Sequence, residues 1–76
     1  MRDKYSIEPS IEENNKIQKL YEIQNFFLLE NETKELIKKY PSSANLMNIL
    51  GVSLQAQKKY KESIEAYKKS IHLKPD

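Results

Sequence analysis

Few side chains in this 76-residue sequence could do acid–base or metal chemistry. His72 is the only histidine, and there is no cysteine. A zinc site needs several ligands of these types, and a nucleophile needs a base beside it, so neither is expected at His72. Near the end of a helix, a polar or positive side chain suits the helix dipole instead. We therefore expect no catalytic residue, no metal and no cofactor, and we expect that the protein is not an enzyme.

The charged residues are numerous, but their spacing is typical of solvated helix surfaces. The glutamates that could form acid–base pairs stand among lysines and are Glu12, Glu13, Glu62 and Glu65. The lysines that gather toward the C-terminus are Lys58, Lys59, Lys61, Lys68, Lys69 and Lys74. Because glutamates interrupt these lysines and the formal net charge is only +2, a solvated face is favoured over a nucleic-acid site. No nucleic-acid partner is expected.

Length and composition limit the class of protein. A single domain of this size buries only about 60% of the surface that its unfolded chain exposes, so it is marginally stable. No stretch approaches the roughly 18 apolar residues of a membrane span, and the first ten residues lack the apolar run of a signal peptide. We expect a soluble protein without membrane contact. The lack of cysteine fits the cytoplasmic location that we expect, and it fits a thiol-free protein elsewhere equally well.

Apolar residues recur at helical spacing after Ser10, which predicts an all-α fold of four helices. Ser10 with Glu13 three residues later forms a capping box that opens the first helix, and Pro41 ends the second. We predict a flexible N-terminal segment at 1–9 and one domain at 10–76. The helices are expected at about 11–23, 26–40, 44–57 and 60–73.

The same spacing predicts which side chains face inward. In the first two helices they are Ile17, Leu20, Tyr21, Phe26, Leu29, Thr33, Leu36, Ile37 and Tyr40. In the last two helices they are Leu46, Met47, Leu50, Leu54, Ile64, Tyr67 and Ile71.

The break between the first two helices is weakly marked. Residues 23–25 contain neither glycine nor proline, and Asn25 is the residue among them that best tolerates left-handed backbone geometry. One continuous helix from Ser10 to Tyr40 is therefore an alternative. We favour the broken form because the second half of the chain matches the first.

The two halves repeat with a period of 34 residues. The matching pairs are Leu20 and Leu54, Phe26 and Tyr60, Lys34 and Lys68, Ile37 and Ile71, and Pro41 and Pro75. Gly51, the only glycine, lies inside the third predicted helix, where it costs about 1 kcal/mol relative to alanine. We expect that it allows a close approach to the fourth helix, against Ser63 or Tyr67.

Both the period and the residue types resemble the tetratricopeptide repeat. Its characteristic positions carry Met47, Leu50, Gly51, Leu54, Ser63, Tyr67 and Pro75. Residues 44–76 resemble a clear repeat, and 10–43 resemble a degenerate one. In the degenerate copy, Glu13, Lys16 and Ile17 stand where a large apolar residue, a leucine and a small residue are typical. The resemblance implies two antiparallel helical hairpins stacked as a short α-solenoid.

The resemblance also implies a non-catalytic protein–protein interaction module, whose concave groove binds a peptide or a partner helix. Amide side chains can hydrogen-bond the backbone of an extended peptide, although an ordinary polar helix face explains them equally well. The groove positions carried over from the resemblance are Asn14, Gln18, Tyr21, Asn45, Asn48, Val52 and Gln55.

A further implication concerns self-association. In a stack of such repeats, Ile64 and Ile71 would touch the opening helix of a following repeat. We therefore expect a homodimer through these two residues, or contact with a further domain. The alternative is that the chain is the N-terminal repeat segment of a larger enzyme, such as a bacterial sulfotransferase or glycosyltransferase. A reading frame that continues past Asp76 would decide for this alternative.

Overall fold

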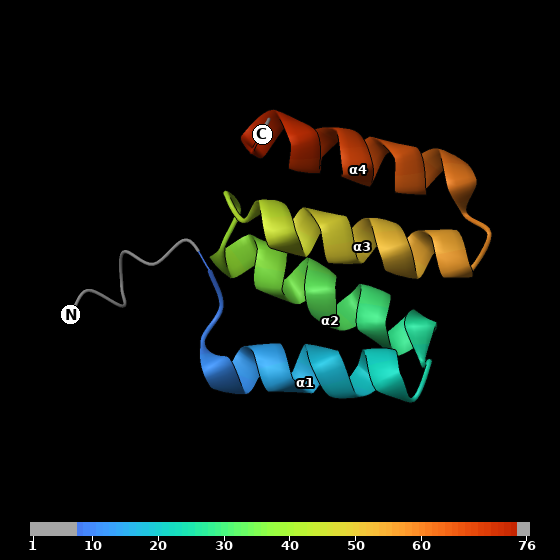
Figure 1. Cartoon of the computed structure of the whole chain (residues 1–76). Helices are drawn as coiled ribbons and strands as arrows, with labels where there is room; N and C mark the ends of the chain where they lie inside the picture. Colours follow the sequence, from blue (N-terminus) through green and yellow to red (C-terminus); the bar gives the residue numbers. More distant parts are fainter. Residues whose placement is uncertain (1–7, 75–76) are drawn as a thin grey trace.

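The computed structural model describes residues 8–74, and in this range it consists of four α-helices without a β-strand. The helices are α1 (Ile11–Glu22), α2 (Phe26–Lys39), α3 (Ala44–Ala56) and α4 (Tyr60–Leu73). Each helix runs antiparallel to the one before it and packs against it, so the chain forms a stack from α1 to α4 (Figure 1). The predicted all-α fold of helical hairpins is confirmed, and each helix ends within one residue of its predicted boundary.

The predicted flexible segment at 1–9 lies mostly outside the described residues, which begin at Glu8. Pro9 is buried. The carboxylate of Glu8 accepts a hydrogen bond of 2.6 Å from the hydroxyl of Ser43, the residue that precedes α3. The end of this segment is therefore tied to the helices.

Side chains from α1, α2 and α3 form the main apolar core. Ile17, Leu29, Leu36 and Leu46 are buried there, and Leu29 and Leu46 have no exposed surface. The side chains packed around them are Leu20, Phe26, Ile37, Tyr40 and Ile49. Burying one such leucine or isoleucine is worth about 1.5 to 3 kcal/mol, so this cluster is a large share of the stability of a domain this small.

Three of the helices begin with a side-chain cap. The Ser10 hydroxyl accepts from the N–H of Glu13 at 3.1 Å, and the Glu13 carboxylate accepts from the N–H of Ser10 at 3.0 Å. This confirms the predicted capping box. Asn25 and Ser43 cap α2 and α3 by accepting from backbone N–H groups three residues later. Such caps satisfy donors that the first turn of a helix leaves unpaired.

The chain is broken between α1 and α2, so the alternative of one continuous helix is wrong. The left-handed residue is Gln24, with φ of 60°, and not Asn25. Asn25 instead takes the N-cap position of α2, where its side chain holds the N–H of Leu28 at 3.2 Å. Because capping requires a different backbone conformation at Asn25, the left-handed turn falls one residue earlier.

The 34-residue period is present in the backbone as well as in the sequence. Lys58 lies 34 residues after Gln24 and also has a positive φ, 65°. After each of these residues, an N–H bonds back to the carbonyl five residues earlier, which closes the preceding helix. The equivalent bonds are Asn25 to Leu20 at 3.0 Å and Lys59 to Leu54 at 2.9 Å. The two hairpins therefore turn with the same geometry.

Gly51 lies where α3 and α4 approach closely. A Cβ atom added to it would be 2.7 to 2.9 Å from ring carbons of Tyr67, which is too short for carbon atoms. The hydroxyl of Ser63 also donates to the carbonyl of Gly51 at 2.8 Å. Both residues that the sequence proposes as neighbours of Gly51 are in contact with it.

Some side chains predicted to face inward do not. Ile64 and Ile71 are 52% and 63% exposed, and Tyr21 is half exposed. The buried residues of α4 are Ser63 and Ala66. Small residues face α3 because the two helices are close, and this turns the isoleucines toward the side of α4 that no other described helix covers.

Candidate functional site

A hollow of about 230 Å³ lies between α1 and α3. Ile17, Ile49 and Val52 give it apolar walls, and Gln18 and Tyr21 border it. It brings together three of the residues that the sequence assigns to a peptide groove: Gln18, Tyr21 and Val52. Ile17 and Ile49 were not among the predicted groove residues. Ile49 lies three residues before Val52, which is the helical spacing that could have identified it.

The remaining predicted groove residues lie on the same two helices but do not line this hollow. Asn45, Asn48 and Gln55 are exposed on α3, and Asn14 is half-buried on α1. Asn14 donates to the carbonyl of Pro9 at 3.2 Å and so holds the chain that enters α1.

The amides near the hollow differ in whether they already have partners. Gln18 donates to Glu22 at 3.1 Å, and Gln55 accepts from the hydroxyl of Tyr67 at 2.9 Å. In the described part of the chain, the side chains of Asn45 and Asn48 form no hydrogen bond. These two amides are available to a ligand without the loss of an internal bond.

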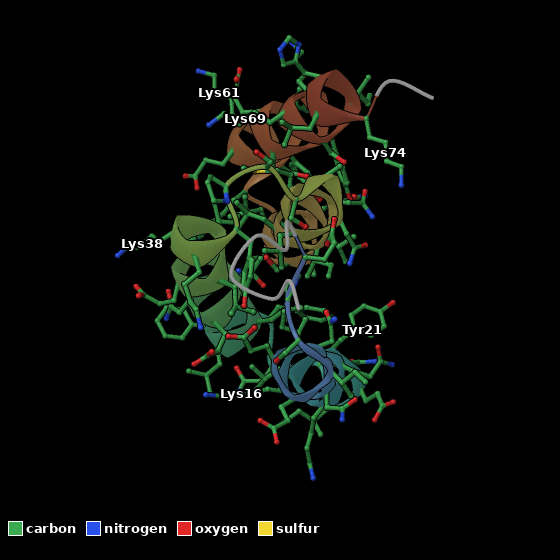
Figure 2. All side chains as sticks on the ribbon, turned by 90° about the vertical axis from the view of Figure 1, so that its left-hand side faces the viewer. Lys16, Tyr21, Lys38, Lys61, Lys69 and Lys74 are labelled. Carbon is green, nitrogen blue, oxygen red and sulfur yellow. The ribbon has the colours of Figure 1, made fainter. Side chains whose placement is uncertain are left out.

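The ring of Tyr21 is positioned by an aromatic contact. It meets the ring of Phe26 edge to face, with the ring centroids 6.2 Å apart and an angle of 77° between the planes. Half of Tyr21 remains exposed beside the hollow. Figure 2 shows it projecting from the side of the stack opposite to Lys38. Tyr21 can therefore contact a bound chain with its ring, its hydroxyl or both.

A polar network fixes α1, one wall of the hollow, against α2. The carboxylate of Glu13 accepts from Lys39 at 2.6 Å and from the hydroxyl of Tyr40 at 2.7 Å. The bonds from Lys39, Tyr40 and the Ser10 backbone lower the pKa of Glu13 from 4.5 to about 2. Glu13 stands where the resemblance to the repeat leads one to expect a large apolar residue. The first hairpin is thus held partly by charge.

A second network joins α2 to the turn between α3 and α4. Glu30 is only 4% exposed. Its carboxylate contacts Lys34 at 2.7 Å, Lys59 at 3.2 Å and the side-chain amide of Gln57 at 2.9 Å. Burial alone would raise the pKa of Glu30, but the three hydrogen bonds outweigh burial and hold it at about 2. The carboxylate therefore stays charged although it is buried.

The other candidates for chemistry remain apart. His72 is exposed near the end of α4, where it borders a hollow of about 460 Å³ with Lys68, Lys69 and Glu65. Between Glu8 and Lys74, no group of three or more histidine, aspartate or glutamate side chains is placed to hold a metal ion. The described helices are also too short or too polar to cross a membrane. Comparison with protein-family models, with curated proteins and with solved structures finds no match.

Proposed function

We propose that this chain is a non-catalytic protein–protein interaction module of the tetratricopeptide-repeat type, and that the hollow between α1 and α3 receives a peptide or a partner helix. The observation that carries the proposal is the hollow itself, in which Ile17, Ile49 and Val52 lie beside the polar groups of Gln18 and Tyr21. Such a surface can take an apolar side chain and pair the polar backbone around it.

The size and surroundings of the hollow support a peptide as the ligand. Its volume of about 230 Å³ is below the roughly 300 to 1,000 Å³ of small-molecule pockets, so it suits one or two side chains. Asn45 and Asn48, whose amides form no hydrogen bond within residues 8–74, lie on the exposed side of α3. Each amide offers donors and an acceptor to an extended backbone. A cytoplasmic location and the absence of a nucleic-acid partner belong to the same proposal.

The test is a displayed library of random peptides selected on the full chain. Enriched peptides are then compared on Val52→Glu, which puts a charge into the hollow, and on Lys38→Glu, which changes an exposed residue on the opposite side. We expect Val52→Glu to lose binding by at least about tenfold and Lys38→Glu to keep it. Peptides that bind Val52→Glu as tightly as the unchanged chain, or no enrichment at all, would refute the groove.

The exposed isoleucines of α4 favour a second contact. Ile64 and Ile71 are more than half exposed, and covering what remains exposed would give roughly half of the 1.5 to 3 kcal/mol that full burial of such a side chain is worth. A second copy of the chain or a further domain could cover them. The latter includes the alternative that this is a repeat segment of a larger enzyme. Sedimentation at micromolar concentration tests the homodimer, because a chain that stays monomeric would exclude it at that concentration.

A further inference from the structure

One side of α4 combines apolar and basic side chains and is covered by no other described helix. This outer face of α4 consists of Tyr60, Lys61, Ile64, Lys68 and Ile71. Tyr60 and Lys61 are neighbours that lie four and three positions before Ile64, and Lys68 and Ile71 follow at spacings of four and three, so the five residues share one side of the helix. All five are exposed, and Tyr60, Ile64 and Ile71 are each more than half exposed. Neither Lys61 nor Lys68 has an ion pair among residues 8–74.

The chain itself contains a partly covered version of this face. One period earlier, the equivalent residues of α2 are Phe26, Phe27, Glu30, Lys34 and Ile37. There α3 packs against α2, Glu30 is buried, and Phe26 and Ile37 pack against the core. The α2–α3 interface therefore indicates what a helix on the outer face of α4 would contact.

The two faces differ in charge at two positions, where Lys61 replaces Phe27 and Ile64 replaces Glu30. On α2, Lys34 is neutralised by Glu30, four residues earlier, at 2.7 Å. On α4 the equivalent of Lys34 is Lys68, but Ile64 stands in place of Glu30. The lysine has been kept and its carboxylate has not. Glu65 lies three residues before Lys68 but forms no ion pair with it among residues 8–74, so a covering helix that brings a carboxylate would give Lys68 the partner that Glu30 gives Lys34.

We propose that the outer face of α4 docks an acidic amphipathic helix, with apolar side chains against Ile64 and Ile71 and a carboxylate near Lys68 and Lys61. This deepens the second contact proposed above for Ile64 and Ile71 by naming the chemistry of its occupant, and it does not depend on the peptide groove. The lysines add specificity to an apolar contact, because an incoming helix with basic flanks would place like charges together.

The same lysines argue against a second copy of the chain as the occupant. In a two-fold pairing of outer faces, Lys61 and Lys68 of one copy would share the interface with the same lysines of the other.

Pairing of α4 with α1 of another copy in the register of the repeat is also unsuitable. The exposed residues Glu12, Asn15 and Lys19 of α1 are the equivalents of Leu46, Ile49 and Ser53. They offer no apolar side chain to cover the isoleucines of α4.

The probe that tests the proposal can be taken from the chain. Residues 43–57 contain α3 with its cap, the helix that covers the equivalent face of α2. Within the chain Gln57 contacts Glu30, whose equivalent on α4 is Ile64, so a charge at position 57 of a docked peptide would lie near Lys68. Two peptides of this sequence, acetylated and amidated, are made with Gln57→Glu and Gln57→Lys, and each is titrated into the isotopically labelled full chain.

We expect the Gln57→Glu peptide to bind about tenfold more tightly than the Gln57→Lys peptide, with the largest NMR shift changes at Ile64 and Ile71. The chain variant Lys68→Glu should reverse this preference, and Lys38→Glu on the exposed side of α2 should leave it unchanged. Equal affinity of the two peptides, shift changes centred on Tyr21, or no binding at millimolar concentration would overturn the proposal. So would a stable dimer of the unchanged chain that Ile64→Lys dissociates.

Discussion

The two hairpins fill the same position between their helices with side chains of opposite size. In the first hairpin, Ile17 on α1 and Thr33 on α2 are both buried. One period later, Gly51 stands at the position of Ile17 and Tyr67 at the position of Thr33. The bulk comes from the first helix in one hairpin and from the second helix in the other. The repeat therefore pairs a larger with a smaller side chain in both hairpins and exchanges the helices that carry them.

The hairpins also differ at the end away from the turn, where the start of the first helix lies beside the end of the second. In the first hairpin, Glu13 on α1 forms an ion pair of 2.6 Å with Lys39 on α2. The equivalent residues of the second are Met47 and Leu73, which border the same hollow. The first hairpin is thus held there by a charge that depends on pH, whereas the equivalent side chains of the second hairpin are apolar and do not titrate.

The largest expected effect is that of Gly51→Leu. Any Cβ at this position meets the ring of Tyr67 at less than 3 Å, and Tyr67 is itself held by its bond to Gln55. We expect a loss of about 3 kcal/mol in the free energy of unfolding, measured by urea denaturation with circular dichroism. An unchanged midpoint would show that α3 and α4 are not in close contact there.

A double variant sharpens the comparison of sizes. Gly51→Ile with Tyr67→Thr gives the second hairpin the arrangement of the first. We expect the double variant to be more stable than Gly51→Ile alone by about 1 to 2 kcal/mol, although Tyr67→Thr alone is destabilising. If the two effects simply add, the two positions do not share one space.

Removal of the Glu30 carboxylate comes next. Glu30→Ala removes one of the three acceptors of the Gln57 amide and leaves Lys34 and Lys59 without their counter-ion, but both lysines are partly exposed and can be hydrated. We expect a loss of about 2 kcal/mol in urea denaturation. The control is Glu35→Ala, which breaks the exposed pair with Lys38 and should change stability by less than about 0.5 kcal/mol.

Acid should reveal the charged networks. The pKa of Glu13 and of Glu30 is lowered from 4.5 to about 2 in the folded chain, so the unfolded chain binds more protons between these values. The contribution of these two carboxylates to the free energy of unfolding is therefore fully present above pH 4.5, and it is lost as the pH falls toward 2. Urea midpoints measured from pH 6 to pH 2 should show this fall, and Glu13→Gln with Glu30→Gln should flatten it. If the urea midpoint of the double variant falls with pH as steeply as that of the unchanged chain, Glu13 and Glu30 are not the source of the pH dependence.

The smallest effect concerns the two equivalent turns. Gln24 and Lys58 have φ of 60° and 65°, where a side chain costs about 1 kcal/mol and glycine does not. Gln24→Gly and Lys58→Gly should each raise the free energy of unfolding by about 0.5 kcal/mol, since the flexibility of glycine in the unfolded chain offsets part of the gain. Clearly unequal gains would show that the turns are not equivalent.

Local patterns in the sequence predicted much of the fold. The serine at position 10, the proline at 41 and the apolar spacing located the helices to within one residue, and the isolated glycine located the contact between α3 and α4. These signals act over three or four residues or through one missing side chain. They need no knowledge of the distant parts of the chain.

What the sequence did not predict depends on distant contacts. The partners of Glu13 are 26 and 27 residues away, and Gln57 and Lys59 are 27 and 29 residues from Glu30. Nothing in the local spacing distinguishes these glutamates from solvated ones. For Ile64 and Ile71, helical spacing predicted an inward position, whereas the resemblance to the repeat predicted an outer contact. Their exposure agrees with the second prediction, because the small residues of α4 face α3.

The central claim is that the two hairpins are one unit repeated every 34 residues, with α4 presenting an open face to a further helix. It can be tested by appending a second copy of residues 43–76 after Asp76, which continues the period without a linker. We expect a single unfolding transition at a higher urea midpoint, with a slope larger by about half, as for one longer cooperative stack. Ile64→Lys with Ile71→Lys in the original copy should uncouple the appended hairpin. If the first 76 residues unfold at their original midpoint while the appended copy behaves separately, the claim is contradicted.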